Sequence, residues 1–204
     1  MGVLKSKIYF IYRGTSSKTQ WADDAEGWQD NPGWADCKEC QIHHGFHKCM
    51  DATFEQAATA VSALRKEFPS YPVVTAGHSL GGALSNLGAI LLIQKGIQNV
   101  IHYSFGSPRV GNVAFATYSE KLLPHAQRIT HFKDMVPHTP PAYVPLVATY
   151  EHIVTEVYED EHHVLHPCKG PSDPTCSSQW STFETNPADH SLYLDVVTSC
   201  PDLS

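Results

Sequence analysis

Apolar and polar positions follow two different periods along this chain, and the two periods predict strands and helices in alternation. Four short runs rich in β-branched and aromatic residues are typical of buried strands: residues 7–12, 73–76, 100–105 and 128–132. Three longer stretches, which end close to proline or glycine, are typical of helices: residues 49–68, 80–94 and 113–122. This order predicts an α/β fold, with a mainly parallel central sheet and helices on both of its faces.

The segments outside this alternation are less regular. Residues 16–41 form a long polar stretch with three Trp residues, for which we expect a loop with one short helix. Residues 153–158 alternate as in a strand with one solvated face. Residues 159–187 are expected to form a second long loop, and residues 191–197 a last short helix.

Composition places the chain among globular proteins and excludes several classes. Its 204 residues predict one domain, 1–204. A net charge of −7 without a cluster of Lys or Arg argues against nucleic-acid partners. The longest apolar run, near residues 87–93, is too short for a transmembrane segment. Six Cys residues indicate disulfides, and therefore secretion or an oxidising lumen, although the first ten residues do not resemble a signal peptide.

The motif with the clearest chemistry is Gly77-His78-Ser79-Leu80-Gly81, which fits the pattern G-x-S-x-G. It lies between a predicted strand and a predicted helix, where a sharp turn can present a nucleophilic serine. The glycines remove side chains that would collide in such a turn, and the N-terminus of the helix favours a developing oxyanion. We therefore expect Ser79 to be the nucleophile. The alternative is a glycine-rich turn with an idle serine.

A nucleophilic serine needs a base, and the base needs an orienting acid. In α/β-hydrolases the order along the chain is serine, acid, histidine. Asp134 follows the strand predicted at 128–132, and His190 precedes the last predicted helix, so we expect them to be acid and base. The neighbouring Asp189 is expected to be a surface or capping residue. Four further histidines compete with His190 and are expected to be solvated: His152, His162, His163 and His166.

Five segments together resemble the class 3, or fungal-type, lipase family. They are RGT at 13–15, GHSLGG at 77–82, FGSPRVGN at 105–112, DMVP at 134–137 and DHSLYL at 189–194. The resemblance implies an α/β-hydrolase fold in which Ser79, Asp134 and His190 form a catalytic triad. It also implies that Thr15 and Leu80 supply the oxyanion hole. By the same resemblance Trp21 lies in a lid, and the chain is expected to lack the usual N-terminal elements of the family.

The cysteines allow two interpretations. The segment at 37–49 contains enough Cys and His residues to hold zinc by ligand count. The resemblance instead implies a disulfide between Cys37 and Cys40, and a similar disulfide across a loop rich in Gly and Pro. The last pair follows only by elimination, since six Cys allow fifteen pairings. The expected disulfides are Cys37–Cys40, Cys168–Cys176 and Cys49–Cys200.

These observations predict a serine carboxylic ester hydrolase, most of all a triacylglycerol lipase that works through an acyl-enzyme and needs no metal or organic cofactor. Its partners are a lipid or other carboxylic ester and a lipid–water interface. The segment at 18–27 is short and acidic, which favours weak interfacial activation. Alternatives are a feruloyl-type or short-chain esterase, a phospholipase A1, and a lipid-binding descendant without activity.

Overall fold

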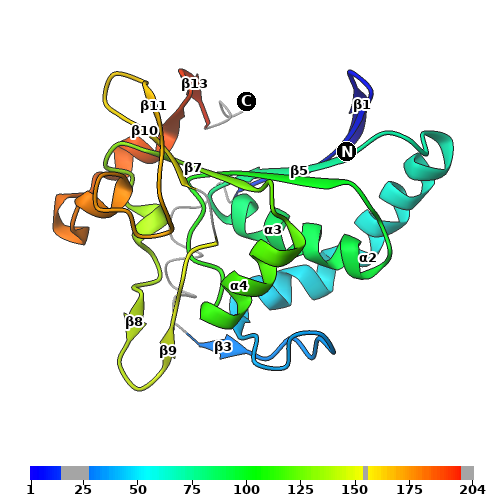
Figure 1. The fold of residues 1–204 in the computed structure, drawn as a ribbon, viewed down its shortest axis with the longest axis horizontal. Coiled ribbons are helices and arrows are strands. Elements are labelled where there is room, and N and C mark those ends of the chain that lie inside the picture. Colours follow the sequence, from blue (N-terminus) through cyan, green and yellow to red (C-terminus); the bar gives the residue numbers. More distant parts are fainter. Residues whose placement is uncertain (15–27, 154–155, 199–204) are drawn as a thin grey trace, which may run out of the picture.

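The computed structural model describes residues 1–14, 28–153 and 156–198, and its centre is a seven-stranded sheet (Figure 1). The five inner strands are parallel, and the strand at each edge is antiparallel to its neighbour. In sheet order the strands are β1 (Gly2–Leu4), β2 (Lys7–Tyr12), β5 (Val73–His78), β6 (Val100–Phe105), β7 (Gln127–His131), β10 (Glu156–Glu159) and β11 (Leu165–Pro167).

The three α-helices of the described residues all lie on one face of this sheet (Figure 1). They are α2 (His44–Glu67), α3 (Leu80–Gln94) and α4 (Val113–Leu122). The expectation of helices on both faces is therefore wrong for this part of the chain. The reason is the strand order, because β2, β5, β6 and β7 follow one another in a single direction. Right-handed crossovers that advance in one direction leave every connecting helix on the same side.

Helix α3 lies between the sheet and the other helices and is buried along most of its length. Gly88 allows this close packing, because a Cβ at that position would come within 2.8 Å of the Phe10 ring. Helix α2 is amphipathic instead and buries one stripe of residues, as the spacing of its apolar positions predicted. It begins at His44, earlier than expected, because the His43 side chain accepts a hydrogen bond from the Gly45 N–H (3.1 Å) and caps the first turn.

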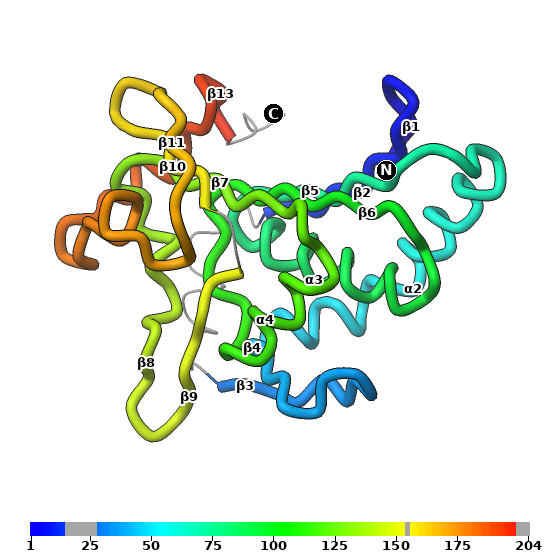
Figure 2. Tube along the Cα trace, viewed as in Figure 1, coloured from blue at the N-terminus to red at the C-terminus, as the bar shows by residue number. Residues whose placement is uncertain are grey.

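Short elements complete the fold. The two-stranded pairs are β3 (Gln29–Asp30) with β4 (Ile42–His43), β8 (Tyr143–Val144) with β9 (Ala148–Thr149), and β12 (Leu192–Tyr193) with β13 (Val196–Val197). The 3-10 helices are η1 (Val136–His138), η2 (Ser177–Gln179), η3 (Thr182–Glu184) and η4 (Pro187–Ser191). The loop expected at 159–187 therefore contains β11, η2 and η3. Figure 2 shows the C-terminal hairpin at the same end of the molecule as β10 and β11, and β12 contacts β7, although about sixty residues separate these two strands in sequence.

The prediction of a helix at 191–197 is wrong, because the segment forms the β12–β13 hairpin. Leu194 and Asp195 make its two-residue turn, and both have positive φ angles of 52° and 60°. Such angles are typical of the tight hairpin turns that match the twist of the strands. Neither residue is Gly or Asn, so the usual signal of such a turn is missing from this segment.

The part of the chain that the structure describes contains two disulfides, Cys37–Cys40 and Cys168–Cys176, as the resemblance implies. The zinc interpretation of the segment at 37–49 is wrong, since two of its thiols are bonded to each other. Cys200 lies outside the described residues, so the Cys49–Cys200 pair stays a prediction. None of the helices in the described ranges combines the length and the hydropathy that a bilayer crossing requires.

Candidate active site

Ser79 stands at the sharp turn between β5 and α3, with φ 59° and ψ −132°. A positive φ is costly for a residue with a Cβ, and such strain persists only where the surroundings enforce it. Three glycines permit the turn. A Cβ on Gly77 would overlap the Gly81 carbonyl, and one on Gly82 would lie 2.8 Å from the Ser107 Cβ. The predicted strand–turn–helix context of Ser79 is therefore present.

Asp134 and His190 meet across 56 residues of sequence. The His190 Nδ1 and the Asp134 Oδ2 lie 2.8 Å apart, and the carboxylate is almost completely buried while the imidazole is 18% exposed. Asp134 follows β7 in the turn that leads to η1, and its Oδ1 accepts a hydrogen bond from the Val136 N–H (2.8 Å). The pair has the arrangement in which a carboxylate holds one imidazole nitrogen and leaves the other free for chemistry.

Tyr193 also contacts the Asp134 carboxylate, a role that the sequence did not predict. Its hydroxyl donates a hydrogen bond to the Asp134 Oδ2, and its side chain is 2% exposed. Burial, and then the charge of Asp134, raise the pKa of Tyr193 well above its usual value, so the hydroxyl keeps its proton and remains a donor. The residue lies in the DHSLYL segment, but only the hairpin turns its ring toward Asp134.

His78 connects the serine turn to His190. The two imidazole rings are 4.3 Å apart, and the His78 Nε2 donates a hydrogen bond to the His190 carbonyl oxygen (2.8 Å). Burial, and then the neighbouring His190, lower the pKa of His78 to about 4, so its ring is neutral near pH 7. His190 is thereby held beside the residue that precedes Ser79.

Gly106, in the loop after β6, leaves room for the acid–base pair. Its φ is 55°, and a Cβ there would come within 2.7 Å of both the Asp134 Oδ2 and the Tyr193 hydroxyl. A side chain at this position would displace the carboxylate from His190.

One expected donor of the oxyanion hole, the Leu80 N–H, lies at the start of α3. Leu80 is the first residue of α3, so its N–H has no acceptor within the helix and lies at the positive end of the helix dipole. The backbone at Gly14 passes close to Ser79, since a Cβ on Gly14 would lie 3.4 Å from the Ser79 Cβ. The residue before Thr15 is therefore next to the serine. Thr15 and Trp21 themselves lie outside the described residues, so the roles expected for them stay predictions.

The competing histidines have other partners. The expectation that His152 is solvated is wrong, because it is buried and its Nε2 donates to the Pro137 carbonyl oxygen (2.6 Å). Burial lowers its pKa well below the usual value, and a neutral ring is consistent with that contact. His163 and His166 contact carboxylates outside the Ser79 site, and His162 is exposed beside Glu161.

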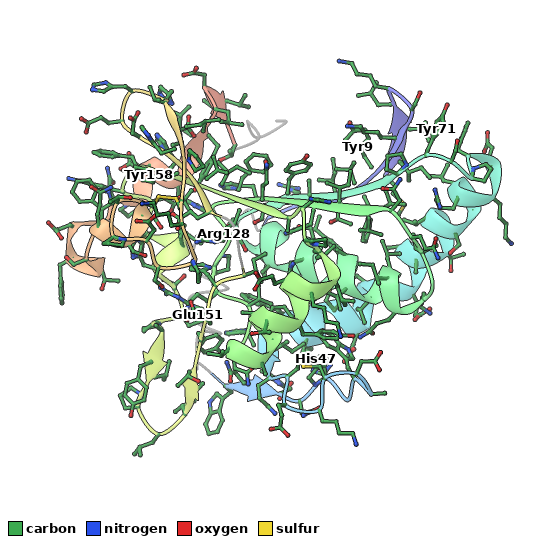
Figure 3. The ribbon with its side chains drawn as sticks, viewed as in Figure 1. Tyr9, His47, Tyr71, Arg128, Glu151 and Tyr158 are labelled. Carbon is green, nitrogen blue, oxygen red and sulfur yellow. A yellow bond between two sulfur atoms is a disulfide. The ribbon has the colours of Figure 1, made fainter. Side chains whose placement is uncertain are left out.

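A buried ion pair supports the strand that leads to Asp134. Arg128 on β7 and Glu156 on β10 are joined by a 2.8 Å contact, and both side chains are fully buried. Burial alone would raise the pKa of Glu156, but Arg128 together with hydrogen bonds from Ser177 and Thr130 lowers it. Figure 3 shows Arg128 near the middle of the molecule, with Tyr158 toward one end and Tyr9 and Tyr71 toward the other.

Comparison with known proteins gives one consistent result. The family model for class 3 lipases matches residues 9–144. A lipase of Rhizomucor miehei is 31% identical over 202 residues, which cover 97% of this chain and 54% of that protein. A secreted mono- and diacylglycerol lipase of Gibberella zeae is 32% identical over 169 residues, which cover 72% of this chain and 40% of that protein.

Solved structures agree with this result. The structure of the Rhizomucor miehei lipase propeptide complex has a TM-score of 0.85 and 29% identity, over 95% of this chain and 62% of that one. A structure described as a triacylglycerol lipase with a serine protease triad at its catalytic centre has a TM-score of 0.83, over 95% of this chain and 73% of that one. This chain spans about half the length, or less, of the curated relatives that it matches.

Proposed function

Since the chain belongs to the class 3 lipase family, we propose that it is a serine carboxylic ester hydrolase that acts on glycerides. The observation that carries the proposal is the buried Asp134 carboxylate at 2.8 Å from the His190 Nδ1, beside the strained turn of Ser79. A buried carboxylate and a partly exposed imidazole next to such a turn are the parts of a catalytic triad. The non-enzymatic alternative would not need this combination.

The proposed reaction follows from the positions of these groups. The Ser79 Oγ attacks the ester carbonyl carbon while the His190 Nε2 takes the hydroxyl proton. The resulting oxyanion accepts hydrogen bonds from the Leu80 N–H and from Thr15, each worth about 3 kcal/mol to the transition state. The bond between the acyl carbon and the alcohol oxygen then breaks, His190 gives the proton to the leaving alkoxide, and the acyl group stays on the Ser79 Oγ. Water, activated by the same base, hydrolyses the acyl-enzyme, and Asp134 stabilises the imidazolium in both steps.

The names of the relatives support glycerides as the substrates of this chain. One relative is named for mono- and diacylglycerols, and one structural neighbour for triacylglycerols. We infer the shared class, an acyl ester of glycerol, and expect the acidic segment at 18–27 to give weak interfacial activation. The two disulfides and the secreted relatives support a location outside the reducing cytosol.

The decisive experiment measures hydrolysis of p-nitrophenyl esters from acetate to palmitate, with Ser79→Ala as the blank. Labelling by a fluorophosphonate probe runs in parallel, because that probe reacts only with an activated serine. We expect labelling that Ser79→Ala and His190→Ala both abolish, and rates that peak at long acyl chains. A peak at acetate or butyrate would identify a short-chain esterase instead. A folded protein that neither labels nor hydrolyses any ester would overturn the proposal in favour of lipid binding.

The proposed preference for glycerides is tested with glyceride substrates. Monoolein, diolein and triolein, offered below and above the concentration at which they separate from water, distinguish partial glycerides from triglycerides. A large rate increase on phase separation would contradict the expectation of weak interfacial activation.

A further inference from the structure

A group of potential metal ligands lies at the ends of two neighbouring strands, outside the Ser79 site. His131 ends β7 and Glu159 ends β10, and the two residues are partners in the parallel register. His163 lies in the turn that follows β10. One ligand atom from each of these three side chains lies within 4.8 Å of the other two. His131 and Glu159 are buried, and the His163 side chain is 30% exposed.

In each imidazole, the ring nitrogen that faces away from Glu159 lies near an oxygen that can accept its proton. The His131 Nδ1 donates to the Asp189 carbonyl oxygen (3.0 Å), and the His163 Nε2 lies 3.4 Å from an oxygen of the Asp195 carboxylate. Histidines that bind metals usually donate their second N–H to a carbonyl or carboxylate in this way, which fixes the tautomer. The nitrogens left for a ligand role are the His131 Nε2 and the His163 Nδ1. The His163 Nδ1 now donates to the Glu159 Oε1 (2.7 Å) and would release that proton when a metal binds.

We propose that His131, Glu159 and His163 bind a zinc ion. Two imidazoles and one carboxylate are a donor set that zinc accepts, at about 2.0–2.2 Å from each ligand atom. The fourth position is left for water. Zinc would take over from the His163 N–H as the positive partner of the Glu159 carboxylate, which is fully buried.

Zinc binding requires a small local rearrangement. The His163 Nδ1 and the Glu159 Oε1 are 2.7 Å apart and must separate to about 3.3 Å on a tetrahedral ion. The two imidazole rings are nearly parallel, at 7°, with centroids 5.5 Å apart, so one ring must turn before both lone pairs reach the same point. His163 is the ring able to turn, because it lies in a turn and is partly exposed.

The position of this site gives it a structural role. His131 contacts the backbone of Asp189, next to His190, and the Glu159 carboxylate accepts the Leu194 N–H next to Tyr193 (3.0 Å). An ion held by the same side chains would tie both strand ends to the segment that carries His190. We expect zinc to stabilise the fold, with no part in ester chemistry, so this site does not depend on the proposed function.

The test uses the full chain, stripped of metal with a chelator and dialysed against zinc. Stoichiometry by inductively coupled plasma mass spectrometry, the melting temperature, and the visible spectrum of the cobalt(II) form are measured for each variant. We expect one zinc per chain, a melting temperature that rises with zinc concentration, and the intense bands of four-coordinate cobalt. His163→Ala should lose all three signals, and Asp195→Asn should weaken zinc affinity by about tenfold.

His166→Ala is the matched control, because His166 lies three residues away and pairs with Asp160 instead. His47→Ala controls for the pair of histidines that share Asp30. Both controls should bind zinc as the unaltered protein does. Zinc that stays stoichiometric in His163→Ala, that is lost in either control, or that never binds the unaltered protein would overturn the proposal. His163→Ala carries the test, since replacing the buried His131 or Glu159 risks misfolding.

Discussion

Removing one oxygen from Tyr193 tests how the structure holds the catalytic carboxylate. In Tyr193→Phe the ring keeps its packing against His78, Phe105 and His131, because those contacts involve only carbon atoms of the tyrosine. The hydroxyl that donates to the Asp134 Oδ2 is lost. Among the described residues, the Asp134 carboxylate, 1% exposed, then keeps two donors, His190 and Val136.

The size of the effect follows from the burial and charge of the acceptor. A hydrogen bond to a charged group contributes about 1.5–3 kcal/mol, and water cannot easily replace the lost donor at a buried site. We therefore expect the free energy of unfolding to fall by about 2 kcal/mol. In a chain of this size that corresponds to a melting temperature lower by roughly 4–8 °C. The His190–Asp134 contact remains, so kcat/KM should fall by no more than about tenfold, which is ~1.4 kcal/mol.

Thermal unfolding followed by circular dichroism, together with p-nitrophenyl ester kinetics, measures both quantities. Tyr143→Phe is the matched control, because Tyr143 is 64% exposed and should tolerate the change without effect. A Tyr193→Phe protein as stable as this control would refute the argument that the hydroxyl supports a buried carboxylate. A variant that folds but is as inactive as Ser79→Ala would show that the hydroxyl takes part in the chemistry.

Three further predictions concern the turn, the ion pair and the buried histidines. Gly77→Ala should abolish ester hydrolysis, because its Cβ has no room in the serine turn, whereas Gly170→Ala, where a Cβ meets nothing within 4 Å, should keep full activity in the same assay. Glu156→Gln should lower the free energy of unfolding in urea by about 3–5 kcal/mol, because it leaves a fully buried arginine uncompensated, and a loss below about 1 kcal/mol would contradict this. His102 and His152 are neutral in the folded protein, since burial lowers the pKa of His102 to about 3 and that of His152 well below its usual value. Their unfolded forms take up protons near pH 6.5, so the stability that they permit is complete above that pH and is lost as the pH falls toward the folded values. Urea titrations should show a fall of about 2–3 kcal/mol per pH unit between pH 6 and 4, and a flat profile there would count against neutral buried rings.

Local patterns predicted a large part of the fold. The bounds expected for β2, α3, β6 and α4 agree with the structure. In these elements the apolar periodicity and the glycine or proline that ends the element all lie within or beside the segment itself. The motif around Ser79 was likewise readable, because a nucleophile turn needs particular residues at neighbouring positions.

Segments whose structure depends on distant partners were predicted less well. The hairpin at 192–197 looked like a short helix, since its turn residues carry no glycine. What holds that turn is the Glu159 carboxylate on another strand, which accepts the Leu194 N–H. His152 is expected to be solvated because it lies next to a predicted strand with one solvated face, but the fold buries it against η1.

The sequence by itself determined the alternation of strands and helices, the serine turn, and the candidates for acid and base. Only the tertiary structure decided that the helices share one face, that Tyr193 supports Asp134, and that His131, Glu159 and His163 gather at two strand ends. The physical reason is that periodicity and turn chemistry act between near neighbours in the chain. Sheet order and register instead bring together residues that are far apart in sequence, and those contacts set the burial and the charge of each functional group.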